Sequence, residues 1–158
     1  MANVEDLVQR GLHENEVLDL ENNNLGDDGV HQLAQMEILK DIKRLELGDN
    51  EITDTGVEAL VNSPYVSNLK SLNLKSNKLT SVGTRAIAVS PHLGNLDSLI
   101  LKFNDIGEEG ARHIANSETL TNLTTLDLFR SRIGKEGTLA IKRSPLYKNL
   151  SRVRLSEV

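Results

Sequence analysis

The chain has 158 residues, of which 38% are hydrophobic and 26% are charged, and 18 basic against 23 acidic residues give a formal net charge of −5. It contains no cysteine, so disulfides, thiolate catalysis and thiolate metal sites are excluded. The negative charge disfavours long polyanions, and no apolar run approaches the roughly 20 residues that span a bilayer, so we expect a soluble, cytoplasmic protein.

The first predicted element is a short helix over residues 3–12. Its signals are an N-cap, one apolar face and a glycine stop, provided by Asn3, Val4, Leu7, Val8 and Gly11. This stretch does not fit the pattern that begins at residue 17. We therefore interpret residues 1–16 as an N-terminal capping segment that covers the first strand.

A 27-residue unit then repeats along the rest of the chain without an insertion. Its first leucine recurs every 27 residues, at Leu18, Leu45, Leu72, Leu99 and Leu126, with Val153 in the sixth unit. From that leucine a unit reads Leu-x-Leu-x-x-Asn-x-Leu, as in residues 72–79. A fixed period of about 20 to 29 residues with this motif is the leucine-rich-repeat pattern.

Each unit begins with a strand, because its two leucines lie two residues apart and so point to the same face. An asparagine ends the strand, where its amide can donate to and accept from backbone groups that leave the sheet. The asparagine column comprises Asn23, Asn50, Asn77 and Asn104, and Ser131 replaces it in the fifth unit.

A helix follows each strand. Thr53 and Thr80 are N-cap types, and acids that suit the helix dipole crowd the first turn, namely Asp27, Asp28, Asp54, Glu108 and Glu109. A glycine column in this turn predicts close approach of neighbouring backbones, and it contains Gly29, Gly56, Gly83, Gly110 and Gly137. A proline column ends the helix, at Pro64, Pro91 and Pro145, each directly after a serine.

One such unit cannot bury its apolar face alone, so the units must stack. Stacked strands lie about 4.8 Å apart and packed helices roughly 8–10 Å apart, and this mismatch bends the stack. The predicted fold is therefore α/β: a curved leucine-rich-repeat solenoid, a right-handed β/α superhelix with a concave parallel sheet and outer helices. It spans residues 17–158 as five repeats plus a terminal strand.

The terminal strand leaves two alternatives. Its free edge either pairs with another chain, or its polar side chains Arg152, Arg154 and Ser156 block pairing, as short charged edges commonly do. We favour the second alternative, and expect a monomer or weak self-association through this uncapped strand.

Units of this length with a helical half such as Ile106 to Ala115 resemble the ribonuclease-inhibitor-type leucine-rich repeats. The Ser-Pro-x-Leu-x-Asn-Leu return from Ser90 to Leu96 is similar to versions common in bacterial repeat proteins, including effectors directed at host proteins. The resemblance covers residues 17–158. It implies a non-enzymatic module that binds a protein partner, either in the cytoplasm or after delivery into a host cell by a non-Sec secretion system.

Charge is distributed unevenly along the array. Residues 1–60 hold 15 acids and 4 bases, whereas residues 61–158 hold 8 acids and 14 bases. A solvated surface that keeps the array soluble would explain the difference, and so would steering of a partner with a complementary field. We favour steering.

The concave face supplies the predicted binding site. Both phenylalanines of the chain, Phe103 and Phe129, fall at outward positions of neighbouring units, next to lysine and arginine. Exposed aromatics beside arginine are typical of binding hot spots, although Phe129 could instead shield the last units. The predicted partner-binding set is Lys75, Ile100, Lys102, Phe103, Phe129 and Arg130, with Asp19, Glu21, Glu46 and Asp49 as an acidic counter-patch.

Other functions have weaker support. The four histidines fall in different columns or outside the array, and we predict no catalytic residue, no metal site and no cofactor; they are His13, His31, His92 and His113. Regulation of a small GTPase, in the manner of a GTPase-activating protein, rests on analogy within this repeat class and assigns no residue. A single nucleic-acid strand could stack on the phenylalanines, but the acidic first half opposes a polyanion.

Overall fold

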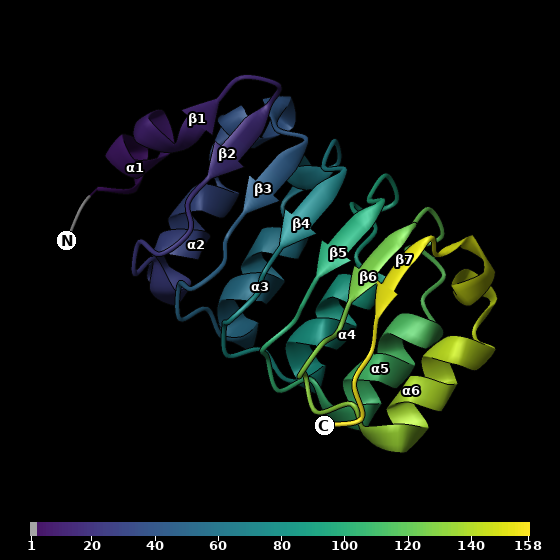
Figure 1. Cartoon of the computed structure of the whole chain (residues 1–158). Coiled ribbons are helices and arrows are strands. Elements are labelled where there is room, and N and C mark those ends of the chain that lie inside the picture. The colour runs from purple at the N-terminus through teal and green to yellow at the C-terminus, as the bar shows by residue number, and fades with distance from the viewer. Residues whose placement is uncertain (1–2) are drawn as a thin grey trace.

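The computed structural model describes residues 3–158, with the strands in one layer and the repeat helices in a second layer along one side of them (Figure 1). The strands are β1 (Leu12–His13), β2 (Val17–Asp19), β3 (Arg44–Glu46), β4 (Ser71–Asn73), β5 (Ser98–Ile100), β6 (Thr125–Asp127) and β7 (Arg152–Arg154). The α-helices are α1 (Val4–Gly11), α2 (Gly26–Ala34), α3 (Asp54–Val61), α4 (Ser81–Val89), α5 (Gly107–Ala115) and α6 (Gly134–Arg143). Short 3-10 helices lie in return segments, at Glu37–Asp41, Pro64–Val66 and Pro145–Asn149.

The strands lie in one sheet, in chain order from β1 to β7. From β2 to β7 neighbours are parallel, and each residue pairs with the one 27 positions later, as Leu18 pairs with Leu45 and Leu45 with Leu72. β1 is antiparallel to β2 and pairs Leu12 with Leu18. The predicted fold is confirmed: the chain forms a curved α/β solenoid with a parallel sheet.

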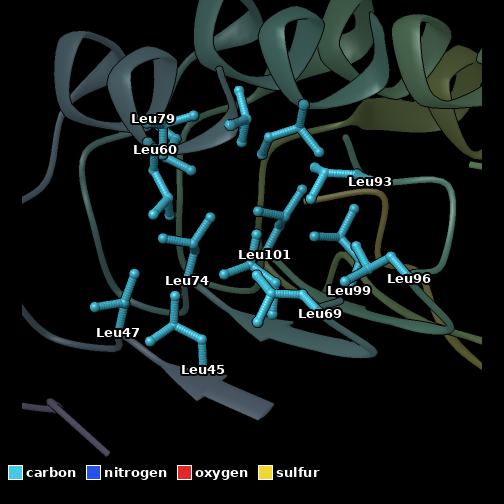
Figure 2. Packing of buried hydrophobic residues seen from close by; sticks show 14 of the residues in the cluster. Leu45, Leu47, Leu60, Leu69, Leu74, Leu79, Leu93, Leu96, Leu99 and Leu101 are labelled. Atoms are coloured by element: carbon cyan, nitrogen blue, oxygen red, sulfur yellow. The ribbon is translucent and has the colours of Figure 1, made fainter. Parts of the chain in front are cut away.

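The core lies between the sheet and the helices. Leu45 and Leu47 of one unit are fully buried, as is Leu60 of α3, and Figure 2 shows them among the other leucines beneath the helices. Each such side chain contributes about 1.5–3 kcal/mol to folding. One cluster of buried residues runs from Val4 to Leu146, so the core is shared by all the units and belongs to none of them separately.

The asparagine column forms a hydrogen-bond ladder inside the array. The Asn77 amide donates to the carbonyls of Leu47 (3.1 Å) and Leu74 (3.0 Å), and its oxygen accepts from the backbone N–H groups of Asn50 (3.1 Å) and Ile52 (3.0 Å). Asn50 and Asn104 bond in the same way, so these three asparagines join their own unit to the one before it, whereas the Asn23 amide donates to the Glu21 carbonyl of its own unit. The predicted donor and acceptor roles are confirmed for these three.

The start of α3 is also tied to the preceding unit. The Asp27 carboxylate accepts hydrogen bonds from the backbone N–H groups of Thr53 (2.8 Å) and Gly56 (3.1 Å), and from the Thr53 hydroxyl. The same contact recurs one unit later at α4, between Asp54, Thr80 and Gly83. These two threonines are the N-caps of their helices, as predicted. Each aspartate lies in the first turn of its own helix and also accepts hydrogen bonds from the start of the next helix.

The glycine column marks close approach of neighbouring backbones, as predicted, because a Cβ at Gly56 or Gly83 would lie 3.3 Å from the Cα atom of Asp27 or Asp54 respectively. The closest contacts, however, are with side chains. A Cβ atom at Gly56 or Gly83 would collide with the carboxylate of Asp27 or Asp54 respectively. At Gly110 it would lie 2.9 Å from the Cβ atom of Ile106. Side chains of the same and the preceding unit, more than neighbouring backbones, therefore require glycine in this turn.

The serine before each proline provides a third set of hydrogen bonds between units, after those of the asparagines and the aspartates. Helix α4 ends at Val89, and the Ser90 hydroxyl donates to the carbonyl of Val61 in α3 at 2.6 Å. Ser63 makes the same bond to Ala34, also at 2.6 Å. The helix ends lie where the proline column predicts them, while the serine satisfies a carbonyl at the end of the previous helix.

The N-terminal helix α1 begins after Asn3, whose side chain accepts from the N–H of Glu5 at 2.7 Å. Its apolar face is buried, as expected, at Val4, Leu7 and Val8. Helix α1 ends at Gly11, as predicted, with Gly11 as its last helical residue and the extended Leu12 as the cap. A Cβ at Gly11 would also collide with the carbonyl oxygen of Asp19 in β2. Strand β1 was not predicted.

Candidate functional site

The face of the sheet that the helices leave uncovered carries the predicted site (Figure 1). Its side chains form three columns that cross all the repeats. The strand column contains Asp19, Glu46, Asn73, Ile100, Asp127 and Arg154. The exit column contains Glu21, Gly48, Lys75, Lys102, Phe129 and Ser156. The turn column contains Asn22, Asp49, Ser76, Phe103, Arg130 and Glu157.

The acidic half of this face is neutralised in part by its own cations. Lys75 reaches across Gly48 to Glu21, with its Nζ 3.3 Å from the carboxylate. A Cβ at Gly48 would lie 2.8 Å from the Lys75 side chain, so the missing side chain at Gly48 opens this path. Lys75 therefore points toward the acidic end of the array rather than toward the phenylalanines.

Glu46 is a poorer contact residue than the sequence predicts. It is only 7% exposed, its carboxylate accepts from the Asn73 amide at 2.7 Å, and the Arg44 guanidinium bonds to it. The hydrogen bond to Glu46 and its negative charge raise the pKa of Arg44. Asp19 and Asp49 are exposed, and they carry the acidic character of this end of the face.

The aromatic pair lies at the other end. Phe103 is 44% exposed and Phe129 is half-buried, and the two rings meet edge to face with 5.9 Å between centroids and 79° between planes. Cations surround the pair: the Arg154 and Arg130 guanidinium carbons lie 4.5 Å and 5.6 Å from the Phe129 centroid, and the Lys102 ammonium lies 6.0 Å from that of Phe103. We call these five residues the aromatic–cation cluster.

From Asn22 to Arg130 the turn column holds its residues in the left-handed region of backbone space. Values of φ are 56° at Asn22 and Asp49 and 53° at Ser76, and they are 60° at Phe103 and 51° at Arg130. Asparagine and aspartate tolerate this region better than other residues with a Cβ, whereas a bulky side chain there is strained. The units of Phe103 and Arg130 therefore place less suitable residue types at this position than the first three units do.

Within residues 3–158, the cations of the cluster differ in their partners. Arg154 forms an ion pair with Asp127 at 3.4 Å, and Asp127 is 7% exposed. Lys102 and Arg130 have no carboxylate within 4.0 Å in the described chain. The predicted set is thus brought together at Lys102, Phe103, Phe129 and Arg130, with Ile100 half-buried on β5.

The outer face carries a second exposed apolar group. Val82 and Val89 of α4 are 56% and 58% exposed, and they line a hollow of about 480 Å³ between α3, α4 and α5. Among the residues described, no group of three or more metal-ligating side chains is present, and no helix is long and apolar enough to cross a membrane.

One family model matches most of this chain. The model of the family described as "Leucine Rich repeat" matches residues 16–34, 40–61, 67–88, 92–115 and 119–142. The chain belongs to the leucine-rich-repeat family. No curated protein matches this leucine-rich-repeat chain significantly, so the remaining likenesses are to solved structures.

Three structures share the fold of this leucine-rich-repeat protein. The C-terminal domain of tropomodulin from Caenorhabditis elegans aligns over 94% of this chain and 93% of its own, with a TM-score of 0.68 and 16% identity. Leiomodin-1 actin-binding site 2 aligns over 98% of this chain and 79% of its own, with a TM-score of 0.53 and 16% identity. An internalin of Listeria monocytogenes aligns over 77% of this chain and 37% of its own, with a TM-score of 0.50 and 24% identity.

Sequence reasoning missed two features of the leucine-rich-repeat surface, although signals for both exist. The turn column reads Asn22, Asp49 and Ser76 in its first three units, and such residues are typical of left-handed turns. The lone glycine of the exit column, Gly48, marks the gap that Lys75 crosses. Both signals are visible only when the units are aligned in columns.

Proposed function

We propose that this leucine-rich-repeat protein binds a protein partner through the concave face of its sheet. The proposed contacts are Ile100, Lys102, Phe103, Phe129 and Arg130, with Lys75 and the acidic residues Asp19, Glu21, Glu46 and Asp49 along the rest of the face. The observation that carries the proposal is Phe103, an aromatic ring exposed to water on a strained backbone. Proteins with this repeat generally mediate protein–protein interactions, which agrees with this assignment.

Two independent costs meet at Phe103. The exposed part of its ring gains nothing from folding, and a left-handed backbone conformation costs roughly 1 kcal/mol for a residue with a Cβ. Asn22, Asp49 and Ser76 show that polar residues occupy the same position elsewhere in the array. Strained, exposed groups cluster at functional sites, where binding uses them, so the ring is best explained as a contact residue.

The acidic end has a supporting role in this proposal. Asp19 and Asp49 are exposed, whereas Glu21 and Glu46 are held by Lys75 and Arg44. Exposed charges steer encounter over about one Debye length, roughly 8–10 Å, and add little affinity of their own. We assign the acidic residues to orientation of the partner and the aromatic–cation cluster to its retention.

The structural neighbours support protein binding without identifying the partner. One of them is named an actin-binding site, and its likeness to this chain at 16% identity concerns the fold. The ribonuclease-inhibitor-type subfamily, a bacterial source and delivery into a host cell stay predictions, and they depend on the helical half of the unit and on its Ser-Pro return.

A comparison of captured proteins tests the proposal. Wild-type protein, a Phe103→Ala/Phe129→Ala variant and a Val82→Thr/Val89→Thr variant are immobilised, and bound proteins are identified by mass spectrometry. The control removes two exposed apolar side chains from the outer face and leaves the concave face intact. We expect partners that the phenylalanine variant loses and the valine variant retains. Equal recovery by the wild type and the phenylalanine variant would refute the assignment.

A further inference from the structure

We infer that the segment bound at the aromatic–cation cluster is acidic, with an apolar side chain flanked by carboxylates. The inference rests on the proposed function and names the chemistry of the partner. It follows from the charges of the concave face that the fold leaves unpaired, from the exposed ring between them, and from the acidic residues at the far end.

Ion pairs are distributed unevenly on the concave face. At the acidic end both cations are occupied, because Arg44 pairs with Glu46 and Lys75 with Glu21. At the aromatic end Lys102 and Arg130 have no carboxylate within 4.0 Å among residues 3–158. Two cations beside the phenylalanines are therefore left for the carboxylates of a partner, whereas the exposed acids Asp19 and Asp49 lie at the other end of the face.

The two phenylalanine rings are covered to different extents. Arg154 and Arg130 lie against Phe129, whose edge-to-face partner is Phe103, so Phe129 is largely covered from within the protein. Phe103 keeps 44% of its surface exposed. An incoming apolar side chain therefore packs on Phe103, while carboxylates beside it reach Lys102 and Arg130. In an extended segment, alternate residues face the same side, so the pattern is acid-x-apolar-x-acid.

The acidic end gives such a segment a direction. Asp19 and Asp49 are exposed on β2 and at the exit of β3, and they repel carboxylates that approach them. The part of the partner segment that carries its acids therefore binds over β5 and β6. The opposite orientation places like charges together at Asp19 and Asp49 and leaves Lys102 and Arg130 unpaired.

A single nucleic-acid strand also carries negative charge and can stack on aromatics, but the geometry favours a protein segment. Strand binding uses successive bases stacked on successive open rings. Here only Phe103 is exposed, at 44%, while Phe129 is half-buried, and a backbone that continued along the face toward β2 would meet Asp49 and Asp19. A short acidic segment avoids both difficulties.

A selection from random 12-residue peptides displayed on phage tests the inference without knowledge of the natural partner. The immobilised baits are the wild type, Phe103→Asn, and the charge-reversed Lys102→Glu/Arg130→Glu. We expect peptides that the wild type enriches and Phe103→Asn does not, with aspartate or glutamate on both sides of an apolar residue. The charge-reversed variant enriches lysine or arginine around the same apolar residue.

One enriched peptide is then synthesised with a fluorescent label for affinity measurement. We expect Lys102→Gln/Arg130→Gln to weaken its binding about 2- to 30-fold, as two exposed ion pairs would, and 500 mM salt to weaken it relative to 50 mM. The Val82→Thr/Val89→Thr variant binds as the wild type does. A labelled oligothymidylate of 12 nucleotides serves as the competing anion.

The outcomes separate the two levels of the proposal. Peptides that depend on Phe103 but are neutral or basic would overturn the acidic class and leave binding at the concave face standing. Tighter binding of the oligothymidylate than of every enriched peptide would overturn the acidic class in favour of a nucleic acid. Enrichment that is the same on the wild type and on Phe103→Asn would count against both the inference and the proposed function.

Discussion

Replacement of Phe103 by asparagine separates the cost of this residue to folding from its value in binding. The substitution removes an edge-to-face contact worth about 0.5–1.5 kcal/mol and the burial of roughly half a ring, about 1 kcal/mol. It also relieves the strain of a left-handed backbone conformation with φ of 60°, which increases the stability by about 1 kcal/mol. The net expectation is a destabilisation of about 1 kcal/mol, or a fall in Tm of about 2–4 °C for a chain of this size.

Binding is expected to fall much further. A hot-spot aromatic contributes about 2 kcal/mol or more, so the affinity of a Phe103-dependent ligand should drop at least about 30-fold. Urea denaturation followed by circular dichroism measures the first quantity, and fluorescence anisotropy with a selected peptide measures the second. A variant that loses several kcal/mol of stability would show that Phe103 is a core residue rather than a contact.

The backbone strain at position 103 can be tested separately from the loss of the ring. At position 103 glycine and asparagine should be more stable than alanine by up to about 1 kcal/mol, because the three share the loss of the ring and differ in tolerance of positive φ. At Lys102, whose φ is negative, alanine should be more stable than glycine by about 0.5–1 kcal/mol. If alanine is the most stable replacement at both positions, strain at Phe103 is refuted.

Two further predictions concern the bonds between units. Asn77→Ala leaves backbone groups buried without partners and should cost about 3–5 kcal/mol by urea denaturation. Asn77→Ser should cost less, because the hydroxyl of Ser131 fills the equivalent place by donating to a backbone carbonyl; equal costs would show that a hydroxyl does not replace the amide, and a negligible cost of Asn77→Ala would show that the amide is not needed. Gly83→Ala should destabilise the protein by about 1–3 kcal/mol, because the added Cβ collides with the Asp54 carboxylate. Calorimetry should show a smaller loss of stability when Gly83→Ala is made in an Asp54→Ala background. Additive losses from the two substitutions would contradict the collision.

The fold could be predicted because its determinants are local and are repeated. The leucines, the asparagine and the proline each act within one unit or on the next, and a constant spacing of 27 sets the register without knowledge of the structure. The cross-unit bond of Asp27 to Thr53 also has a constant spacing of 26 residues in its two occurrences. It was missed because a first-turn acid has an adequate explanation within its own helix.

The site was predicted less completely, because the contacts of exposed side chains do not follow from the 27-residue period. Lys75 and Glu21 lie two units apart and meet only because Gly48 between them has no side chain. Glu46 occupies an outward position and is nevertheless covered by its neighbours. The outward placement of Phe103 followed from its column, whereas the strained backbone beneath it required the torsion angles.

Two of the three ladders between units have a consequence for the evolution of the array. Asn77 and Ser90 bond to groups one unit away, and the equivalent bonds recur at Asn50 and Asn104 and at Ser63 and Ser117. Duplication or deletion of one whole 27-residue module in the middle therefore replaces each severed bond of these two ladders with its copy. The span of the recognition surface can lengthen or shorten in steps of about 4.8 Å, while the joints that hold it together stay the same.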